Sequence, residues 1–220
     1  MTEILLLNPN TSERTTDMMV DIARGALPPG YIVRGVTAEL GAPIILTPDA
    51  LDAAGYHVID LWRKYGGAAA GIVISAFGDP GIDALRRETR VPVVGICEAS
   101  VLEAASSGRR FGIATITPDL VEPIEACVHA LGLTHTYTGT RLTTGDPEAL
   151  AVNPERLEES LAAAVTECIE LDHAEAVVIG GGPLGRAAVG LSNHFAIPII
   201  APIPAAIRKL VTLLGGSRRI

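Results

Sequence analysis

Eight short apolar runs alternate with helical patterns along the 220-residue chain, and this alternation limits the possible folds more than any other feature. Such runs, separated by amphipathic segments, are typical of parallel βα units, because a parallel connection needs a crossover that a helix supplies. Segment 154–171 has the clearest helical pattern, since Pro154 suits a first helical turn and apolar residues recur on one face. The predicted strands are 3–7, 31–36, 70–75, 91–96, 111–115, 134–138, 176–180 and 197–201.

The two halves of the chain resemble each other at three strand-to-loop junctions. GIVISAFG at 71 matches AVVIGGGP at 176, VPVVGICEA at 91 matches IPIIAPIPA at 197, and LLNPNTSE at 6 matches IATITPDL at 113. The offsets of 105, 106 and 107 residues keep the repeats almost in register. We therefore predict an α/β fold with two pseudo-symmetric lobes, each a four-stranded parallel sheet flanked by helices, and a ligand cleft between them. The expected division is 1–98 plus 206–220 for the first lobe and 99–205 for the second.

Composition and charge narrow the range of partners. Hydrophobic residues make up 48% of the chain and aromatic residues only 4%, which favours buried parallel sheets. The net charge is −8 and no basic stripe is interleaved with aromatics, so no nucleic-acid partner is expected. Because the start lacks a signal-peptide pattern and no apolar run has the length of a membrane span, we expect no membrane partner and a cytoplasmic location. Cys97, Cys127 and Cys168 are odd in number and widely spaced, which argues against a disulfide framework and a zinc cluster.

Small polar and glycine-rich loops follow several of the predicted strands. In open parallel sheets, ligands bind beyond the carboxyl ends of the strands, and here each loop precedes a helix whose first N–H groups are unpaired. A small-molecule substrate with carboxylate or imide oxygens suits such a cleft, although strand-end Ser and Thr side chains can instead cap their own helices. The expected substrate-binding residues are Asn8, Pro9, Asn10, Ser75, Ala76, Phe77, Thr115, Thr117, Gly181, Gly182 and Pro183.

Five motifs together resemble the aspartate/glutamate/hydantoin racemase superfamily, most closely its hydantoin and allantoin racemase branch. The motifs are NPNTS, SAFGDPG, GICEA, TITP and GGGPLG, and the resemblance extends over nearly the whole chain. It implies two pseudo-symmetric α/β lobes, no cofactor and a ligand held between the lobes. It also implies that one cysteine removes the proton next to a carbonyl group and that another returns a proton from the opposite face.

The chain departs from this pattern at the two positions that matter most for the chemistry. By motif, the family's two cysteines correspond to Ala76 and Gly181 here. Neither residue can transfer a proton, so the resemblance excludes the usual two-cysteine racemisation. Either the natural enzyme uses other groups, or the sequence has been altered. We favour the first, because an engineered loss would more often use the same replacement twice.

Asp79, Cys97 and Glu98 are the remaining catalytic candidates near the expected cleft. Asp79, which precedes Pro80, suits an acid–base group or the N-cap of the helix that follows. Cys97 suits a relocated nucleophile or a small core residue, and Glu98 suits a base, a hydrogen-bond acceptor or a lobe-bridging residue. The histidines lack metal-ligand spacing, so no metal site is expected. GGGPLG lacks the acidic residue that a dinucleotide site needs about 20 positions on, so no cofactor is expected.

Three functions remain open from the sequence. The first is a cofactor-independent isomerase, similar to hydantoin racemase, that acts on a small cyclic imide or ureide or a related carboxylate without the cysteine pair. The second is a decarboxylase, hydrolase or lyase, in which N–H groups at the same cleft stabilise an enolate-like charge. The third is a ligand-binding homologue without activity. A homo-oligomer is expected.

Overall fold

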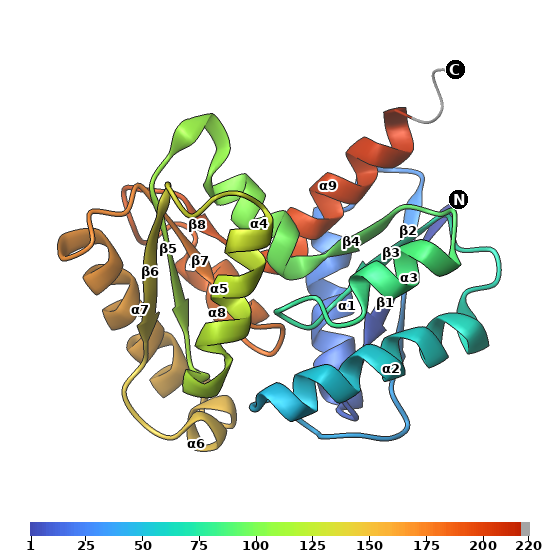
Figure 1. The fold of residues 1–220 in the computed structure, drawn as a ribbon, viewed down its shortest axis with the longest axis horizontal. Helices are drawn as coiled ribbons and strands as arrows, with labels where there is room; N and C mark the ends of the chain where they lie inside the picture. Colours follow the sequence, from blue (N-terminus) through green and yellow to red (C-terminus); the bar gives the residue numbers. More distant parts are fainter. Residues whose placement is uncertain (217–220) are drawn as a thin grey trace.

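The computed structural model describes residues 1–216, which form two four-stranded parallel sheets (Figure 1). The strand orders are β2-β1-β3-β4 and β6-β5-β7-β8, so each strand of the first sheet has a counterpart at the same place in the second. This confirms the predicted α/β fold with two like lobes. The strands are β1 (Thr2–Asn8), β2 (Tyr31–Thr37), β3 (Gly71–Ile74), β4 (Val93–Gly95), β5 (Phe111–Thr115), β6 (Tyr137–Leu142), β7 (Ala176–Ile179) and β8 (Ile199–Ile200).

Helices connect the strands and cover both sheets. Helix α7 spans Pro154–Glu170, as its sequence pattern predicted, and its apolar face is buried. The other α-helices are α1 (Glu13–Ala26), α2 (Pro48–Tyr65), α3 (Ile82–Glu88), α4 (Ile96–Ala104), α5 (Val121–Ala130), α6 (Pro147–Ala151), α8 (Gly185–Leu191) and α9 (Pro202–Gly216), and the short 3₁₀ helices are η1 (Ser106–Gly108) and η2 (Pro118–Leu120).

The side chains of β1 alternate between two hydrophobic cores. Ile4 and Leu6 share a core with α1 and α9, whereas Leu5 and Leu7 share another with α2 and α3. Both faces of the strand are therefore covered, which is why its sequence is a continuous apolar run rather than an alternating one. The core around Ile4 extends into the second lobe, where it includes Phe111 of β5.

The sixth strand differs from the sequence prediction. Residues 134–138 were expected as a strand, but β6 covers Tyr137–Leu142 and pairs with β5 from Tyr137, opposite Phe111. The strand lies at the edge of its sheet and most of its side chains are only half-buried. An edge strand of this kind carries no apolar run that would mark it in the sequence.

Helix α9 follows the last strand of the second sheet but packs against the first lobe. It contacts α1, α4 and β3, and Arg208 of α9 forms an ion pair with Glu103 of α4 at 2.6 Å. Figure 1 shows α4 and α9 between the two sheets. The division into 1–98 plus 206–220 and 99–205 stays a prediction, and residues 217–220 of it lie outside the described residues.

Within residues 1–216, no helix has both the length and the apolar character needed to cross a lipid bilayer.

Candidate active site

A cavity lies between the two lobes and receives residues from both. Its first-lobe wall follows β1 and β3, and its second-lobe wall follows β5 and β7, so it lies at the carboxyl ends of parallel strands as predicted. Ligands of α/β folds bind at this edge because the loops there are free to vary while the sheet holds them in place. The lining residues are Asn10, Ile44, Ile45, Ser75, Ala76, Phe77, Ile116, Thr117, Leu120, Ile124, Gly180, Gly181, Gly182, Pro183 and Leu184.

The two strand-to-helix junctions touch each other across this cavity. A Cβ atom on Gly182 would lie 2.5 Å from the backbone oxygen of Ser75, and a Cβ atom on Gly180 would lie 3.0 Å from the Phe77 ring. The absence of side chains at these glycines lets the second lobe approach the backbone of the first. Ala76 and Gly181, where the sequence motifs predict the family's two cysteines, therefore belong to the two touching junctions and line one cavity.

Four backbone N–H groups at these junctions are available to a ligand. Among the described residues, no hydrogen bond uses the N–H of Ala76, Phe77, Gly181 or Gly182. All four residues line the cavity. Backbone donors that need no reorganisation are the groups that stabilise a developing oxyanion or enolate. The cavity thus offers donors from both lobes to the oxygens of a ligand.

Asn10 contributes a side-chain donor whose orientation is held by the chain itself. Its Oδ1 accepts hydrogen bonds from Nδ2 of Asn8 and from the backbone N–H of Ser12, both at 2.9 Å. Within the described residues its Nδ2 has no hydrogen-bond partner, and this atom is not fully buried. The arrangement fixes the amide so that Nδ2 can donate to a ligand in the cavity.

Ser75 and Thr117 contribute acceptors rather than donors. The Ser75 hydroxyl donates to the Leu7 carbonyl at 2.8 Å, so only its lone pairs remain. Thr115 donates to the Gly180 carbonyl at 2.7 Å, so in the 3.1 Å contact between the two threonines Thr117 is the donor. Both cavity hydroxyls can therefore accept a hydrogen bond from a ring N–H.

Three expected binding residues do not line the cavity. Asn8 is fully buried and donates to Asn10 and to Thr16, so it supports the cavity wall from behind. Pro9 is buried between the two asparagines. Thr115 directly precedes the wall residue Ile116, and its hydroxyl contacts that of Thr117 and so orients it. The binding role of all three stays a prediction, whereas the supporting contacts of Asn8 and Thr115 are a finding.

The isoleucine and leucine residues of the wall were missed by the sequence prediction. Ile44 comes from the segment that precedes α2, Leu120 and Ile124 come from the start of the η2–α5 unit, and Leu184 precedes α8. The one available signal was the pair Ile44–Ile45, an apolar pair inside a Gly- and Pro-containing loop. Helix residues such as Ile124 carry no mark in the sequence that separates a cavity wall from a core.

None of the cavity-lining residues has an ionisable side chain, and the three catalytic candidates lie elsewhere. Glu98 is in the first turn of α4 and forms an ion pair with Arg86 at 2.9 Å. Cys97, beside it, is fully buried. The catalytic role of Asp79, Cys97 and Glu98 therefore stays a prediction, and the chemistry available directly at the cavity is hydrogen bonding.

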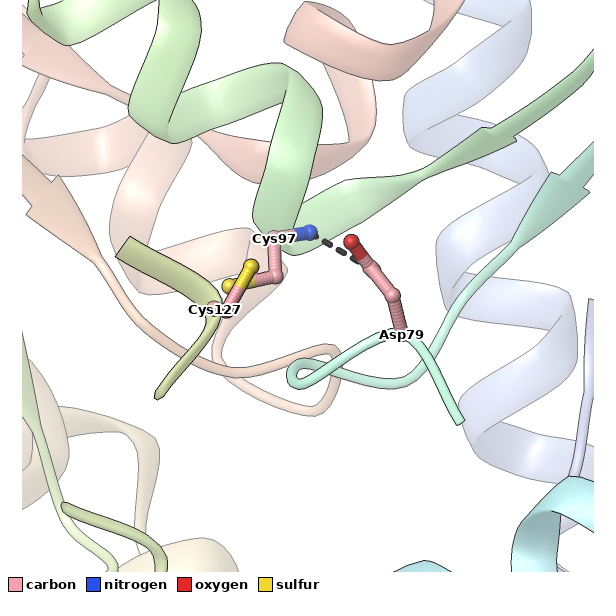
Figure 2. A group of neighbouring side chains, drawn as sticks. All are labelled: Asp79, Cys97 and Cys127. Carbon is pink, nitrogen blue, oxygen red and sulfur yellow. Dashed lines mark hydrogen bonds between the residues drawn. The ribbon is translucent and has the colours of Figure 1, made fainter. Parts of the chain in front are cut away.

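Asp79 is a buried carboxylate that joins two strand-to-helix junctions. Its oxygens accept the backbone N–H groups of Cys97 at 2.9 Å and of Glu98 at 2.7 Å, so it caps the first turn of α4. Figure 2 shows the bond to Cys97. The expected cap of the following helix is wrong, because α3 begins at Ile82 with Gly81 before it and has no side-chain cap. The backbone of Asp79 is left-handed, with φ of 50°, and its side chain reaches the neighbouring junction instead.

Gly95 provides the space for this carboxylate. A Cβ atom on Gly95 would lie 2.0 Å from the carboxyl carbon of Asp79, closer than any real contact. Burial raises the pKa of Asp79 to about 7, and the charge of Glu98 adds to this, while the two backbone N–H groups and Arg86 act in the opposite direction. The loop that carries Ala76 is thus tied to α4 through a group that titrates near neutral pH.

We expect Asp79 to make the free energy of unfolding fall as the pH rises from about 4 to 7. The folded-state pKa of about 7 lies above the ordinary value of 3.8, so in this window the folded state holds a proton that the unfolded state has lost. The slope is about 1.4 kcal/mol per pH unit, and it ends above pH 7. Asp79→Asn removes this component, so the wild-type and variant unfolding curves in urea should diverge between pH 5 and 7. If the difference in the free energy of unfolding between wild type and Asp79→Asn does not change with pH, the raised pKa of Asp79 is contradicted.

One group of metal-binding atoms occurs within residues 1–216, formed by Asp79, Cys97 and Cys127 with their ligand atoms within 4.8 Å of one another. The carboxylate is already bound by two backbone donors. The two sulfurs lie close to each other, and the Cys97 thiol hydrogen-bonds to the Cys127 thiol and to the backbone of Gly78. Cys168 lies apart in α7, where burial raises the pKa of its thiol to about 12.

The chain matches known proteins over nearly its full length. Residues 4–210 match the family model for Asp/Glu/hydantoin racemase. The hydantoin racemase of Paenarthrobacter aurescens is 28% identical over 214 residues, with 96% of this chain and 91% of the relative covered. The solved structure of allantoin racemase from Klebsiella pneumoniae superimposes with a TM-score of 0.91 at 27% identity, covering 99% of this chain and 89% of that chain.

A more distant solved structure has the same fold. Arylmalonate decarboxylase superimposes with a TM-score of 0.62 at 22% identity, over 97% of this chain and 93% of that chain. This similarity concerns the fold alone. The match of the family model to residues 4–210, together with the two like lobes and the cavity between them, leads to one conclusion: the chain belongs to the Asp/Glu/hydantoin racemase family.

Proposed function

We propose that this protein is a cofactor-independent isomerase that acts at the acidic carbon of a small cyclic ureide or imide, without a cysteine pair. The observation that supports it is the set of donors from both lobes around one cavity: four free backbone N–H groups and the Asn10 amide. A hydantoin ring has carbonyl oxygens for these donors and ring N–H groups for the hydroxyls of Ser75 and Thr117. The apolar wall suits an aliphatic or aromatic substituent on the ring.

The catalytic contribution in this proposal is electrostatic. Donors around the ring oxygens stabilise the enolate that forms when the proton leaves, and each such donor contributes roughly 10²–10³-fold in acyl-transfer enzymes. Because no cavity-lining side chain titrates, water or hydroxide carries the proton. The reaction is therefore expected to be slower than one with two thiols, and to accelerate as the pH rises.

The test is exchange of the ring proton in deuterated water. A 5-substituted hydantoin is incubated with the protein, loss of the C5 proton is followed by NMR, and optical rotation is followed in parallel. Exchange faster than in buffer, with equal loss of optical activity, supports an isomerase. Exchange at the buffer rate, with the hydantoin bound, contradicts it.

Asn10→Asp is expected to weaken hydantoin binding by about tenfold or more, because it replaces the donor Nδ2 by an acceptor. The remaining oxygen still accepts from Asn8 and Ser12, so the loop should keep its shape. The dissociation constant is measured by calorimetry or NMR titration. Asn193→Asp, at an exposed position of the second lobe, is the matched control. Equal affinity for wild type and Asn10→Asp would exclude the amide as a ligand contact.

A second candidate function is decarboxylation of a related small carboxylate in the same cavity. The observation that favours it is the missing ionisable side chain, since loss of carbon dioxide produces the same enolate-like charge without a base. Arylmalonate decarboxylase shows that the fold is compatible with this chemistry in another protein. Decarboxylation would be favoured over isomerisation if the protein releases carbon dioxide from an arylmalonate and does not accelerate the exchange of hydantoin protons.

A further inference from the structure

Cys97 and Cys127 form a pair of thiols at the junction between the two lobes. Cys97 lies in the first turn of α4, directly after β4, and Cys127 lies in α5 of the second lobe. Their sulfur atoms lie within 4.8 Å of each other. Figure 2 shows the two sulfurs side by side, while the Asp79 carboxylate is turned toward the backbone nitrogen of Cys97. The two thiols thus lie next to each other at the boundary of the lobes.

This pair connects the two walls of the cavity. Cys127 follows Ile124 by three residues, so both lie on one side of α5, and Ile124 lines the cavity. On the opposite wall, Asp79 follows Ala76 by three residues and holds the backbone N–H of Cys97. A covalent bond between the sulfurs would join the start of α4, with its attached loop, to α5.

We infer that Cys97 and Cys127 form a reversible disulfide that holds the two walls of the cavity at a fixed separation. The half-buried Cys127 is reached first: its thiolate attacks hydrogen peroxide, which gives a sulfenic acid and, after proton uptake by the released hydroxide, water. Cys97 then loses its proton and attacks the sulfenic sulfur, and the hydroxyl group leaves as a second water. Two thiols and one peroxide thus give one disulfide and two waters. A small thiol reductant reverses the reaction by exchange.

The electrostatics support this order of events. Hydrogen bonding to the Cys127 thiol, followed by burial and the nearby Asp79 charge, raises the pKa of Cys97 well above its ordinary value. Cys97 is therefore a neutral thiol at neutral pH, so it is not the thiol that attacks peroxide first, and its attack on the sulfenic sulfur requires loss of its proton. The inference depends on the positions of the two thiols and not on the reaction proposed for the cavity.

Cys168 offers an internal control. It is fully buried in the second lobe, and its thiol faces the Ile113 carbonyl at 3.8 Å. Within residues 1–216 it is absent from the cluster that contains the other two cysteines. If oxidation is selective for Cys97 and Cys127, Cys168 should stay reduced.

The experiment treats the reduced full-length protein with stoichiometric hydrogen peroxide. Thiol titration is expected to show loss of two of the three thiols, and peptide mapping a link between Cys97 and Cys127 with the mass of two hydrogens lost. The thermal midpoint is expected to rise by about 5–10 °C, because the bridge closes a loop of about 30 residues. Hydrogen exchange of segments 75–79 and 120–127 should slow, and a reductant should reverse all three effects.

The variants separate the proposal from general oxidation. Cys168→Ser should behave like wild type, whereas Cys127→Ala should show neither the bridge nor the rise of the midpoint. Peptide mapping of the oxidised wild-type protein tests the link between Cys97 and Cys127 even if a variant folds poorly. Oxidation of Cys127 to a sulfinic acid, a bridge between two molecules, or three thiols that stay reduced would overturn the disulfide. A bridge that leaves the midpoint and the hydrogen exchange unchanged would overturn its effect on the cavity.

Discussion

Cysteines at both Ala76 and Gly181 are expected to increase proton exchange at C5 of a 5-substituted hydantoin by about 10²–10⁴-fold, the usual contribution of positioned acid–base groups. The two positions line one cavity and come from opposite lobes, so one thiol can remove the proton and the other can return it. The free N–H groups at the same junctions would stabilise both the thiolates and the enolate. A single cysteine should have a much smaller effect, because the proton must leave one face of the carbon and return to the other.

The structure identifies an obstacle at the second of these positions. A Cβ atom on Gly181 would lie 2.8 Å from Cγ and 2.9 Å from Cδ1 of Leu184. Leu184 is buried, so Leu184→Ala is included as a third change, and the new thiol occupies part of the vacated volume. We expect the triple variant Ala76→Cys, Gly181→Cys, Leu184→Ala to exceed the double variant.

The measurement is deuterium incorporation followed by NMR for the parent, both single-cysteine variants, the double and the triple variant. Leu184→Ala alone controls for changes in cavity shape. If the triple variant folds and binds the hydantoin but exchanges its proton no faster than the parent, then Ala76 and Gly181 do not stand in acid–base positions.

Gly182→Ala is expected to destabilise the protein by about 2–3 kcal/mol, or to lower the thermal midpoint by about 5–10 °C, and to abolish ligand binding in the cavity. The added methyl group would lie 2.5 Å from the backbone oxygen of Ser75, and a backbone that belongs to a sheet junction cannot move away alone. The two lobes would have to separate at the place where their junctions touch.

Gly181→Ala is the matched control for this substitution. Its methyl group would meet the side chain of Leu184 at 2.8 Å rather than a backbone atom, so we expect a smaller loss of stability than for Gly182→Ala. Thermal unfolding followed by circular dichroism compares the two variants, and NMR titration with a hydantoin compares their binding. Equal midpoints would show that the close approach of Gly182 to Ser75 does not limit the packing of the lobes.

Much of the cavity could be predicted from the sequence because strand ends are local features. Ser75, Phe77 and Thr117 each follow a buried strand, and parallel strands bring their carboxyl ends to one edge of the sheet. The repeat at offsets of 105 to 107 residues predicted that two such edges face each other. In the structure these residues line the cavity, together with Gly181 and its neighbours.

The residues that support the cavity wall from behind, and the aliphatic residues of the wall itself, could not be predicted in the same way. Asn8 ends the first strand, yet its side chain turns to Asn10 and Thr16, because a strand's successive side chains point to opposite faces. Ile44 and Leu184 reach the cavity from segments whose path depends on how α2 and α8 pack. No local pattern distinguishes such residues from ordinary core residues.

The sequence by itself determined the alternation of strands and helices, the burial of the parallel sheets and the two like lobes, because these follow from hydrophobic periodicity and an internal repeat. Tertiary structure decided the partners of the polar and sulfur-containing groups. Asp79 caps α4 rather than its own helix, and Cys97 meets Cys127 from the other lobe. Contacts of this kind form between segments far apart in the chain, and a few ångströms of helix position decide which side chains come within reach of each other.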